Sequence, residues 1–309
     1  MESPPEQRIR NARTGWQRAI ELFDSYSIPA TWAIVGHLLL DECEGTHRDH
    51  PASEFGWFSA DPGGDETESE QWFGLPLVEE IIDADTDHEL GCHSFSHVVF
   101  DRNQITTEIA TAEVRRCNAI AHERGLSFSS FVFPRNVVGF RDVLSRHGFE
   151  AYRGASPPRW YDGSSLYPFA KFATYTGGDT PPPLVRPVVD EHGLVDIPAS
   201  LDLFSFEGIA RRLAQSVGED PVVRQAKMGI DAVTEREGVF HIWLHPNNLV
   251  RKSDFDRLRQ VLSYIADKRD QGLLSVETMA DVAQRVSEED ITNPAETEDI
   301  ARRVETDDD

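Results

Sequence analysis

The stretch Asp87-His-Glu-Leu-Gly-Cys-His-Ser-Phe-Ser-His97 carries two histidines, His93 and His97, at the end of a short apolar run. Imidazoles four residues apart meet on one side of a helical turn, so both can bind one divalent cation where such a turn follows directly on a strand. Ser94 and Ser96 can cap that turn or hold an imidazole through its second nitrogen. The alternative is a loop with two surface histidines, since a motif this short often matches by chance.

Short strand-like segments alternate with helical patterns along most of the chain. The predicted strands are residues 30–35, 88–91, 129–133, 151–153, 194–198, 239–244 and 273–276. The predicted helices are residues 10–26, 75–84, 106–124, 140–147, 206–235 and 254–268. This repeated strand-then-helix order predicts an α/β fold with a parallel barrel, whose functional site lies at the carboxyl ends of the strands.

Four pieces of the chain, taken in order, resemble the polysaccharide deacetylase family, the NodB-homology enzymes of the glycoside hydrolase/deacetylase superfamily. His93 and His97 match its His-Ser-x-x-His pair, and residues 19–36 match its first helix, a Pro-Ala-Thr turn and its second strand. Residues 131–136, Phe-Val-Phe-Pro-Arg-Asn, are similar to its arginine loop, and residues 240–246, Phe-His-Ile-Trp-Leu-His-Pro, to its leucine-histidine strand. The resemblance implies an irregular (β/α) barrel of about seven parallel strands, NodB-like and TIM-like.

One piece of that pattern is absent. Family members open with a strand whose acidic motif supplies a third metal ligand and the general base, whereas residues 1–18 are polar and lead directly into the first predicted helix. A barrel that lacks one strand exposes the edges of its two neighbours. We expect the missing strand to lie upstream of Met1. The alternative is a relative that has lost its base, and the chain as printed is expected to be a poor catalyst because catalytic zinc normally has three protein ligands.

The chemistry that the resemblance implies is metal-assisted removal of an acetyl group from an N-acetylated carbohydrate. His93 and His97 would bind a divalent metal, with zinc as the favoured ion, and an upstream carboxylate would act as the general base. His245, at the end of an apolar strand, would protonate the departing amine. The alternative for His245 is a capped histidine that precedes Pro246.

Two further residues complete the predicted catalytic set. Arg135 corresponds to the family's arginine, which orients the general base, although the family's Arg-x-Pro is replaced here by Pro134-Arg135. Asp196, in Val-Asp-Ile-Pro, would hold Arg135, although the tryptophan that the family has after this acid is missing. The alternative is that Arg135 and Asp196 form an ordinary ion pair at the strand ends.

The charge balance is strongly acidic. Thirty Lys and Arg against 54 Asp and Glu give a formal net charge of −24, and only four of the basic residues are lysines. Such a chain repels nucleic acid and anionic membranes. Excess carboxylate with scarce lysine predicts a halophilic protein, because concentrated salt screens the self-repulsion. An ordinary acidic protein is the alternative.

Other candidate ligands are weaker. The three cysteines, Cys43, Cys92 and Cys117, show no metal-ligand spacing, and their odd number does not suggest a disulfide framework. His47 and His50 lie in an acidic loop, where we expect solvated or substrate-facing side chains rather than metal ligands. Four aromatic residues in or beside two long loops, residues 41–71 and 157–187, are candidates for stacking on sugar rings: Trp57, Trp72, Trp160 and Tyr161.

The domain prediction is one barrel domain over residues 1–287, followed by an acidic, disordered tail over residues 288–309. The chain shows no signal segment, and its longest apolar stretch is too short to cross a bilayer, so the expected location is the cytoplasm. Three functions remain open: a metal-dependent carbohydrate deacetylase, a catalytically inactive carbohydrate-binding relative, and a metal-dependent amidohydrolase that acts on a small non-sugar amide.

Overall fold

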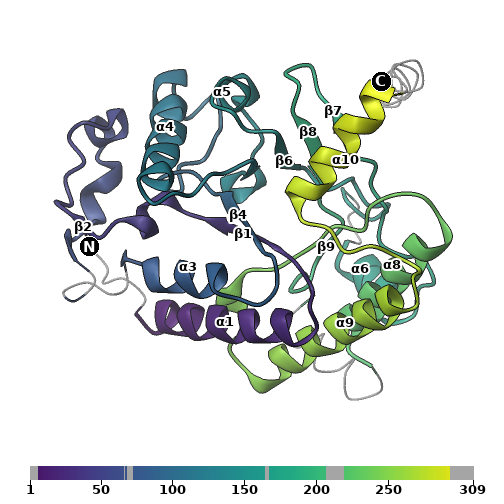
Figure 1. Ribbon diagram of the computed structural model, residues 1–309. Helices are drawn as coiled ribbons and strands as arrows, with labels where there is room; N and C mark the ends of the chain where they lie inside the picture. Colours follow the sequence, from purple (N-terminus) through teal and green to yellow (C-terminus); the bar gives the residue numbers. More distant parts are fainter. Residues whose placement is uncertain (1–5, 66, 68–71, 164–166, 207–218, 293–309) are drawn as a thin grey trace.

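The computed structural model describes residues 6–65, 67, 72–163, 167–206 and 219–292 (Figure 1). Its centre is a sheet in the order β1-β4-β5-β6-β8-β7, in which all neighbouring strands are parallel except the edge strand β7. The strands of this sheet are β1 (Thr31–Ile34), β4 (Glu89–Cys92), β5 (Ser130–Val132), β6 (Ala151–Gly154), β8 (Val195–Pro198) and β7 (Val188–Val189). The predicted α/β fold is therefore confirmed.

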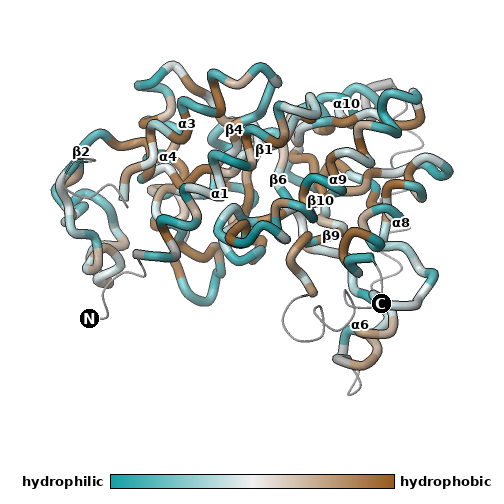
Figure 2. Tube along the Cα trace, turned by 90° about the horizontal axis from the view of Figure 1, so that it is seen from below, coloured by the Kyte–Doolittle hydropathy of each residue, from teal (hydrophilic) through white to brown (hydrophobic). Residues whose placement is uncertain are grey.

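The described helices are α1 (Glu6–Ser25), α3 (Leu75–Ile82), α4 (Thr107–Glu123), α5 (Arg141–Arg146), α6 (Tyr167–Thr176), α8 (Pro221–Glu235), α9 (Lys252–Asp270) and α10 (Met279–Thr292). All except α6 and α10 lie where the sequence predicts a helix. The long loop predicted over residues 157–187 is wrong in part, because it contains α6. The tube of Figure 2 alternates between hydrophilic and hydrophobic colours along α4 and α9, as expected for helices with one buried side. Part of the long helix predicted from residue 206 lies outside the described residues.

Side chains alternate between two faces of the sheet. On the outer face, Phe131 and Tyr152 are fully buried in the main core, where Phe133 meets both rings at centroid distances of 4.9 and 5.7 Å. On the inner face, Val132 and Ile197 pack in a separate cluster with residues of α10. The two clusters show which side chains of each strand lie on the inner face of the sheet and which lie on its outer face.

Helix α10 was not predicted. It covers the inner face near the amino-terminal ends of the strands, where the backbone N–H of Met279 donates to Thr31 Oγ1 (2.8 Å) and that of Ala280 donates to Glu89 Oε2 (3.0 Å). The helix continues past Glu288, the predicted start of the tail, to Thr292. The strand predicted over residues 273–276 is wrong, because this segment is the irregular connection that leads into α10.

The sheet does not close on itself within the described residues. A second, two-stranded parallel sheet joins β9 (Leu201–Asp202) to β10 (Ile242–Trp243), and β9 follows directly on β8. Strand β1 pairs with β4 alone and β10 pairs with β9 alone among the strands described. An open slot therefore separates β1 from β10, the position in which the sequence predicts a missing strand.

The long loop over residues 41–71 contains an antiparallel pair, β2 (Glu42–Cys43) with β3 (Gly64–Asp65), and the 3₁₀ turns η2 (Pro51–Phe55) and η3 (Trp57–Ala60). The prediction that His47 and His50 face solvent or substrate is wrong. The His47 side chain is 6% exposed and that of His50 is 5% exposed. Among the helices of the described segments, none has both the length and the apolar character needed to cross a bilayer.

Candidate active site

The predicted site residues follow the carboxyl ends of three strands. His93 comes directly after β4, Arg135 lies in the turn η5 (Pro134–Asn136) after β5, and His245 comes two residues after β10. Parallel strands bring their carboxyl ends to one edge of a sheet, so their following residues meet there. His93 and His245 line one cavity, and the rings of His93 and His97 lie 4.8 Å apart.

His93 is oriented by the neighbouring strand. Its Nδ1 lies 2.6 Å from the carbonyl oxygen of Val132 in β5. A carbonyl can only accept, so Nδ1 carries the proton and Nε2 presents its lone pair. Burial first, and then the neighbouring His97, lower the pKa of His93 to about 3, which keeps the imidazole neutral. This is the tautomer and protonation state that a metal ligand requires.

His97 reaches the same point by a turn that is not helical. The predicted helical turn is replaced by bends in which Ser94 and His97 both have a φ of 62°. The backbone N–H of His97 donates to Ser94 Oγ (3.0 Å), and the two imidazole centroids are 4.8 Å apart. As a residue His97 is exposed at the mouth of the site. Its ring is nevertheless partly buried, and this burial lowers the pKa of His97. The rings therefore meet as predicted, by a different backbone path.

A buried carboxylate holds this loop in place. Glu113 of α4 is 0% exposed and accepts hydrogen bonds from the backbone N–H of Ser96 (2.8 Å) and from Ser96 Oγ (2.5 Å). Burial raises the pKa of Glu113, while the hydrogen bonds from Ser96, Ser94 and the backbone of Phe95 lower it. Glu113 is thus a positioning residue for the loop that carries both histidines. Apart from its place on a predicted helix, nothing in the sequence pointed to this role.

His245 is positioned by close packing of α1 on the turn η6 (Pro246–Asn248). A Cβ at Gly15 of α1 would lie 2.2 Å from the carbonyl oxygen of Pro246, so only glycine fits there. The His245 ring lies against Trp243, with centroids 5.2 Å apart and planes at 78°. His245 is exposed, so its imidazole remains accessible at the mouth.

Two further residues of the site, Arg153 and Asp202, were missed in the sequence. The Arg153 guanidinium lies over the Trp243 ring (4.6 Å to the centroid) and donates to Asn136 Oδ1 (2.5 Å). Burial lowers the pKa of Arg153 to about 10, which leaves it charged at neutral pH. Burial raises the pKa of Asp202, and the charges of His245, Lys171 and Arg153 oppose this shift. The one signal in the sequence for these residues was the charge of Arg153 at the end of the predicted strand 151–153.

The predicted ion pair between Arg135 and Asp196 does not form. Arg135 is exposed in the left-handed region (φ 56°), and its charge acts on His97. Asp196 lies on the outer face of β8, in register with Tyr152. Burial raises the pKa of Asp196 to about 6, and the positive charge of Arg141 opposes this shift. Strand alternation separates the two residues, because Val195 and Ile197 occupy the inner face.

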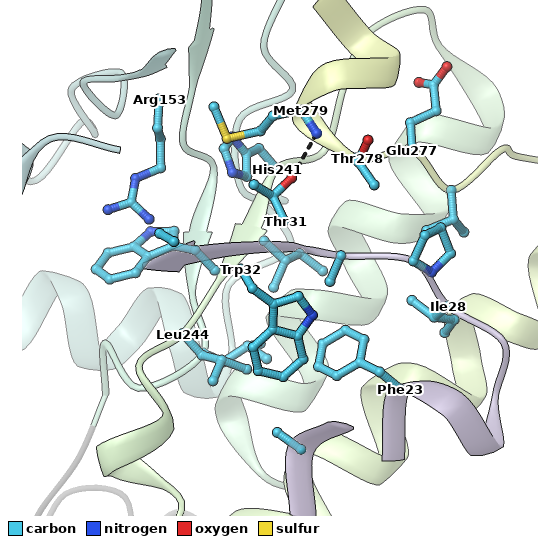
Figure 3. A pocket seen from close by; sticks show the side chains of 18 of the residues that line it. Phe23, Ile28, Thr31, Trp32, Arg153, His241, Leu244, Glu277, Thr278 and Met279 are labelled. Atoms are coloured by element: carbon cyan, nitrogen blue, oxygen red, sulfur yellow. Dashed lines mark hydrogen bonds between the residues drawn. The ribbon is translucent and has the colours of Figure 1, made fainter. Parts of the chain in front are cut away.

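The slot between β1 and β10 forms the pocket drawn in Figure 3, where Trp32, Leu244 and Arg153 are among the lining residues. It encloses a cavity of about 320 Å³. Helices α1 and α9 contribute Phe23, Leu258 and Val261 to its outer side, whereas His93 and Arg153 line it on the inner side. Within the described part of the chain, no third His, Cys, Asp or Glu joins His93 and His97 as a ligand group. If a catalytic metal binds here, the described residues would supply two of its three protein ligands.

His241, on the inner face beside Arg153, predicts a pH dependence of stability. Burial and then the charge of Arg153 lower its pKa from 6.5 to about 4. The unfolded chain therefore takes up a proton first, and this contribution to stability, present above pH 6.5, is lost as the pH falls towards 4. We expect His241→Gln to reduce the slope of the free energy of unfolding against pH in this range by up to about 1.4 kcal/mol per pH unit.

Denaturant unfolding of the metal-saturated protein at several pH values would measure this slope. The matched control is His122→Gln, because His122 is exposed on α4. A slope that falls equally in both variants, or in neither, would contradict the assignment to His241.

The similarity of this chain to known proteins lies in its fold. No protein-family model matches the chain, and no curated protein sequence matches it. Two crystal structures have a similar fold. One is a "putative polysaccharide deacetylase" from Mycobacterium smegmatis, with a TM-score of 0.56, 14% identity, and coverage of 90% of this chain and 79% of that one. The other is the PuuE allantoinase, with a TM-score of 0.53, 15% identity, and coverage of 87% and 71%. The resemblance found in the sequence is thus confirmed at the level of the fold: the chain has the α/β fold shared by these two proteins.

Proposed function

We propose that the protein is a metal-dependent hydrolase that removes acetyl groups from an N-acetylated carbohydrate. The observation that carries the proposal is the His93 and His97 pair at a strand end, in which the hydrogen bond from His93 Nδ1 to Val132 leaves Nε2 available as a ligand. The fold shared with the mycobacterial protein and with the allantoinase supports hydrolysis of a carbon-nitrogen bond other than a peptide bond.

His93 and His97 fit a divalent metal, and zinc suits their nitrogen ligands best. A metal bound there supplies Lewis-acid polarisation of the amide carbonyl. His245, exposed beside Trp243, is placed to protonate the departing amine. Arg153 contributes a permanent positive charge close to His93, which favours the negative charge that develops on the carbonyl oxygen. Arg135 remains a candidate for positioning the base.

The third ligand and the base are proposed to come from an extended segment in the slot between β1 and β10. A strand there would pair with two edges that have no partner strand in the described residues. Its side chains would alternate between the apolar surface of α1 and α9 and the inner face beside His93. An acidic residue on that inner side would complete the ligand set.

A carbohydrate substrate is supported by one aromatic residue near the mouth. Trp57 is 47% exposed, and its Nε1 donates to the carbonyl oxygen of Ser96 (3.2 Å), the residue before His97. A fixed, exposed indole at this place can stack on a sugar ring. Of the other predicted aromatic contacts, Trp160 is 67% exposed, whereas Tyr161 is buried and is no longer a candidate.

Hydrolysis of a small non-sugar amide is the second candidate. The fold shared with the PuuE allantoinase favours this candidate, because that protein is named for a small-molecule substrate. A non-catalytic carbohydrate-binding relative is the third, because the described residues provide two imidazoles and no acid at the metal position.

The test compares two forms in concentrated KCl with added Zn²⁺: the 309-residue chain and the same chain preceded by the residues encoded upstream in frame. We expect acetate release from N-acetylglucosamine oligomers by the longer form and little by the shorter one. A His93→Asn, His97→Asn variant of each form reports how much metal these two ligands hold.

Each outcome decides between the candidates. Hydrolysis of small amides without acetate release from the oligomers would favour the second candidate. If the double variant holds as much metal as its parent in both forms, the proposed active site is wrong, and oligosaccharide binding without hydrolysis would favour the third.

A further inference from the structure

A second group of metal-ligating side chains lies in the long loop, away from His93 and His97. It consists of His37 in the 3₁₀ turn η1 (Gly36–Leu39), Cys43 in β2, His47 in the following loop and Asp61 after η3. One ligand atom from each of the four lies within 4.8 Å of the others. The sequence favoured a solvated or substrate-facing side chain for His47 and showed no metal-ligand spacing for Cys43.

The four ligand atoms are spaced like the corners of one coordination shell. Asp61 Oδ2 lies 3.0 Å from His37 Nε2, 2.8 Å from His47 Nε2 and 3.4 Å from Cys43 Sγ, and the distance from that sulfur to His47 Nε2 is 3.1 Å. Zinc bonds of about 2.0–2.3 Å in a tetrahedron place neighbouring ligand atoms roughly 3.3–3.6 Å apart. The observed spacings approach these values, so small outward shifts would admit the ion.

Hydrogen bonds outside the group orient the ligands inward. His37 Nδ1 lies 3.3 Å from the carbonyl oxygen of Trp72, so Nδ1 carries a proton, and in the neutral ring Nε2 presents its lone pair towards the Asp61 carboxylate. A cation between these two atoms, either a proton or a metal ion, then holds them together. The other carboxylate oxygen of Asp61 accepts from the backbone N–H of Gly63 (2.9 Å), which leaves Oδ2 for the group.

The backbone around Cys43 is shaped for the same purpose. The N–H of Gly45 donates to Cys43 Sγ (3.1 Å), a contact that stabilises a thiolate. Gly45 has a φ of 73°, and a Cβ there would lie 2.9 Å from the Gly63 nitrogen, so the turns that carry Cys43 and Asp61 close tightly on each other.

Three of the four side chains are well shielded from solvent, and Cys43 is half-buried. The side chains of His37, His47 and Asp61 are 9%, 6% and 4% exposed, and Phe58 and Phe95 pack on the His47 ring at centroid distances of 4.3 and 5.5 Å. One thiolate, one carboxylate and two neutral imidazoles balance the charge of a divalent ion. Four protein ligands without an open position are typical of a structural zinc site.

We propose that His37, Cys43, His47 and Asp61 bind one structural zinc ion, separate from the candidate active site. The ion would fasten the β2–β3 pair to the body of the protein. It would also stabilise the loop that carries His93 and His97. The backbone N–H of His37 donates to the carbonyl oxygen of Phe95 in that loop (2.9 Å), and that of Gly36 donates to the carbonyl oxygen of Ser94 (2.8 Å). The site does not depend on the proposed function.

The experiment loads the purified 309-residue protein with Zn²⁺ or with Co²⁺ alone and measures metal per chain and the absorption spectrum. We expect one tightly held ion, and in the Co²⁺ form a sulfur-to-metal charge-transfer band in the near ultraviolet. Cys43→Ser and His47→Asn should each weaken binding at least tenfold, and Cys43→Ser should remove the band. The His93→Asn, His97→Asn variant should keep both the ion and the band.

Cys117→Ala and His122→Asn are the matched controls, since each removes the same residue type outside the group and should change neither readout. A wild-type Co²⁺ spectrum without the thiolate band overturns the proposal, and this result does not depend on whether any variant folds. The proposal also fails if Cys43→Ser retains metal as tightly as the parent protein.

Discussion

Replacing His93 with alanine is expected to lower hydrolysis of an N-acetyl substrate by about 10³-fold or more, in whichever form of the protein is active. His93 is the better ordered of the two imidazole ligands, because its Nδ1 is held by Val132 and its ring is largely buried. Loss of this ligand would remove carbonyl polarisation worth several kcal/mol, and about 4 kcal/mol corresponds to a thousandfold change in rate.

Steady-state rates and metal content, measured on the same preparations, would check this. His93→Ala should lose the active-site metal and keep the ion held by His37, Cys43, His47 and Asp61. His122→Ala is the control, because its exposed side chain on α4 lies outside both groups. A rate within tenfold of the parent would show that His93 is not a ligand of the catalytic metal.

Replacing Arg257 with alanine is expected to lower the free energy of unfolding by about 3–5 kcal/mol. Arg257 of α9 is 1% exposed. Its Nε donates to Asp220 Oδ2 (3.0 Å), and one terminal nitrogen donates to the carbonyl oxygen of Leu203 (2.5 Å). Removal of the guanidinium leaves the Asp220 carboxylate buried without its cation. Asp220 also accepts from the backbone N–H of Val222 at the start of α8, so the helix start is weakened with it.

Denaturant unfolding would give the change in free energy, with Arg259→Ala as the control. Arg259 lies on the same helix, its side chain is 51% exposed, and it forms a surface ion pair with Asp256 one turn away (2.7 Å). Its loss should therefore change the free energy of unfolding by no more than about 0.5 kcal/mol. Equal effects of the two substitutions would contradict the proposed role of the buried pair.

The sequence was sufficient for the parts of the protein that depend on local pattern. Short strand-like segments, separated by helical periodicity, placed five strands of the central sheet within one or two residues, because hydrophobic patterning reflects burial directly. The edge strand β7 was not predicted. The order of those elements then implied parallel strands, and parallel strands brought His93 and His245 to one edge. The polar character of residues 1–18 also predicted the unpaired edge of β1.

The remaining features depended on contacts between segments that are distant in sequence. Arg153 and Asp202 join the site through neighbouring strands, and the face that Asp196 occupies follows from its register with Tyr152. The group of His37, Cys43, His47 and Asp61 shows no ligand motif, because its members come from a 3₁₀ turn, a strand and two loop segments.

The sequence by itself thus determined the α/β alternation, the histidine pair and its place after a strand. Only the tertiary structure decided which charged side chains meet at the site and which lie on the outer face of the sheet against the helices. It also decided which side chains converge as a second group of ligands. The physical reason is that hydrophobic periodicity is a property of each segment alone, whereas a binding site is defined by distances that exist only after the segments pack together.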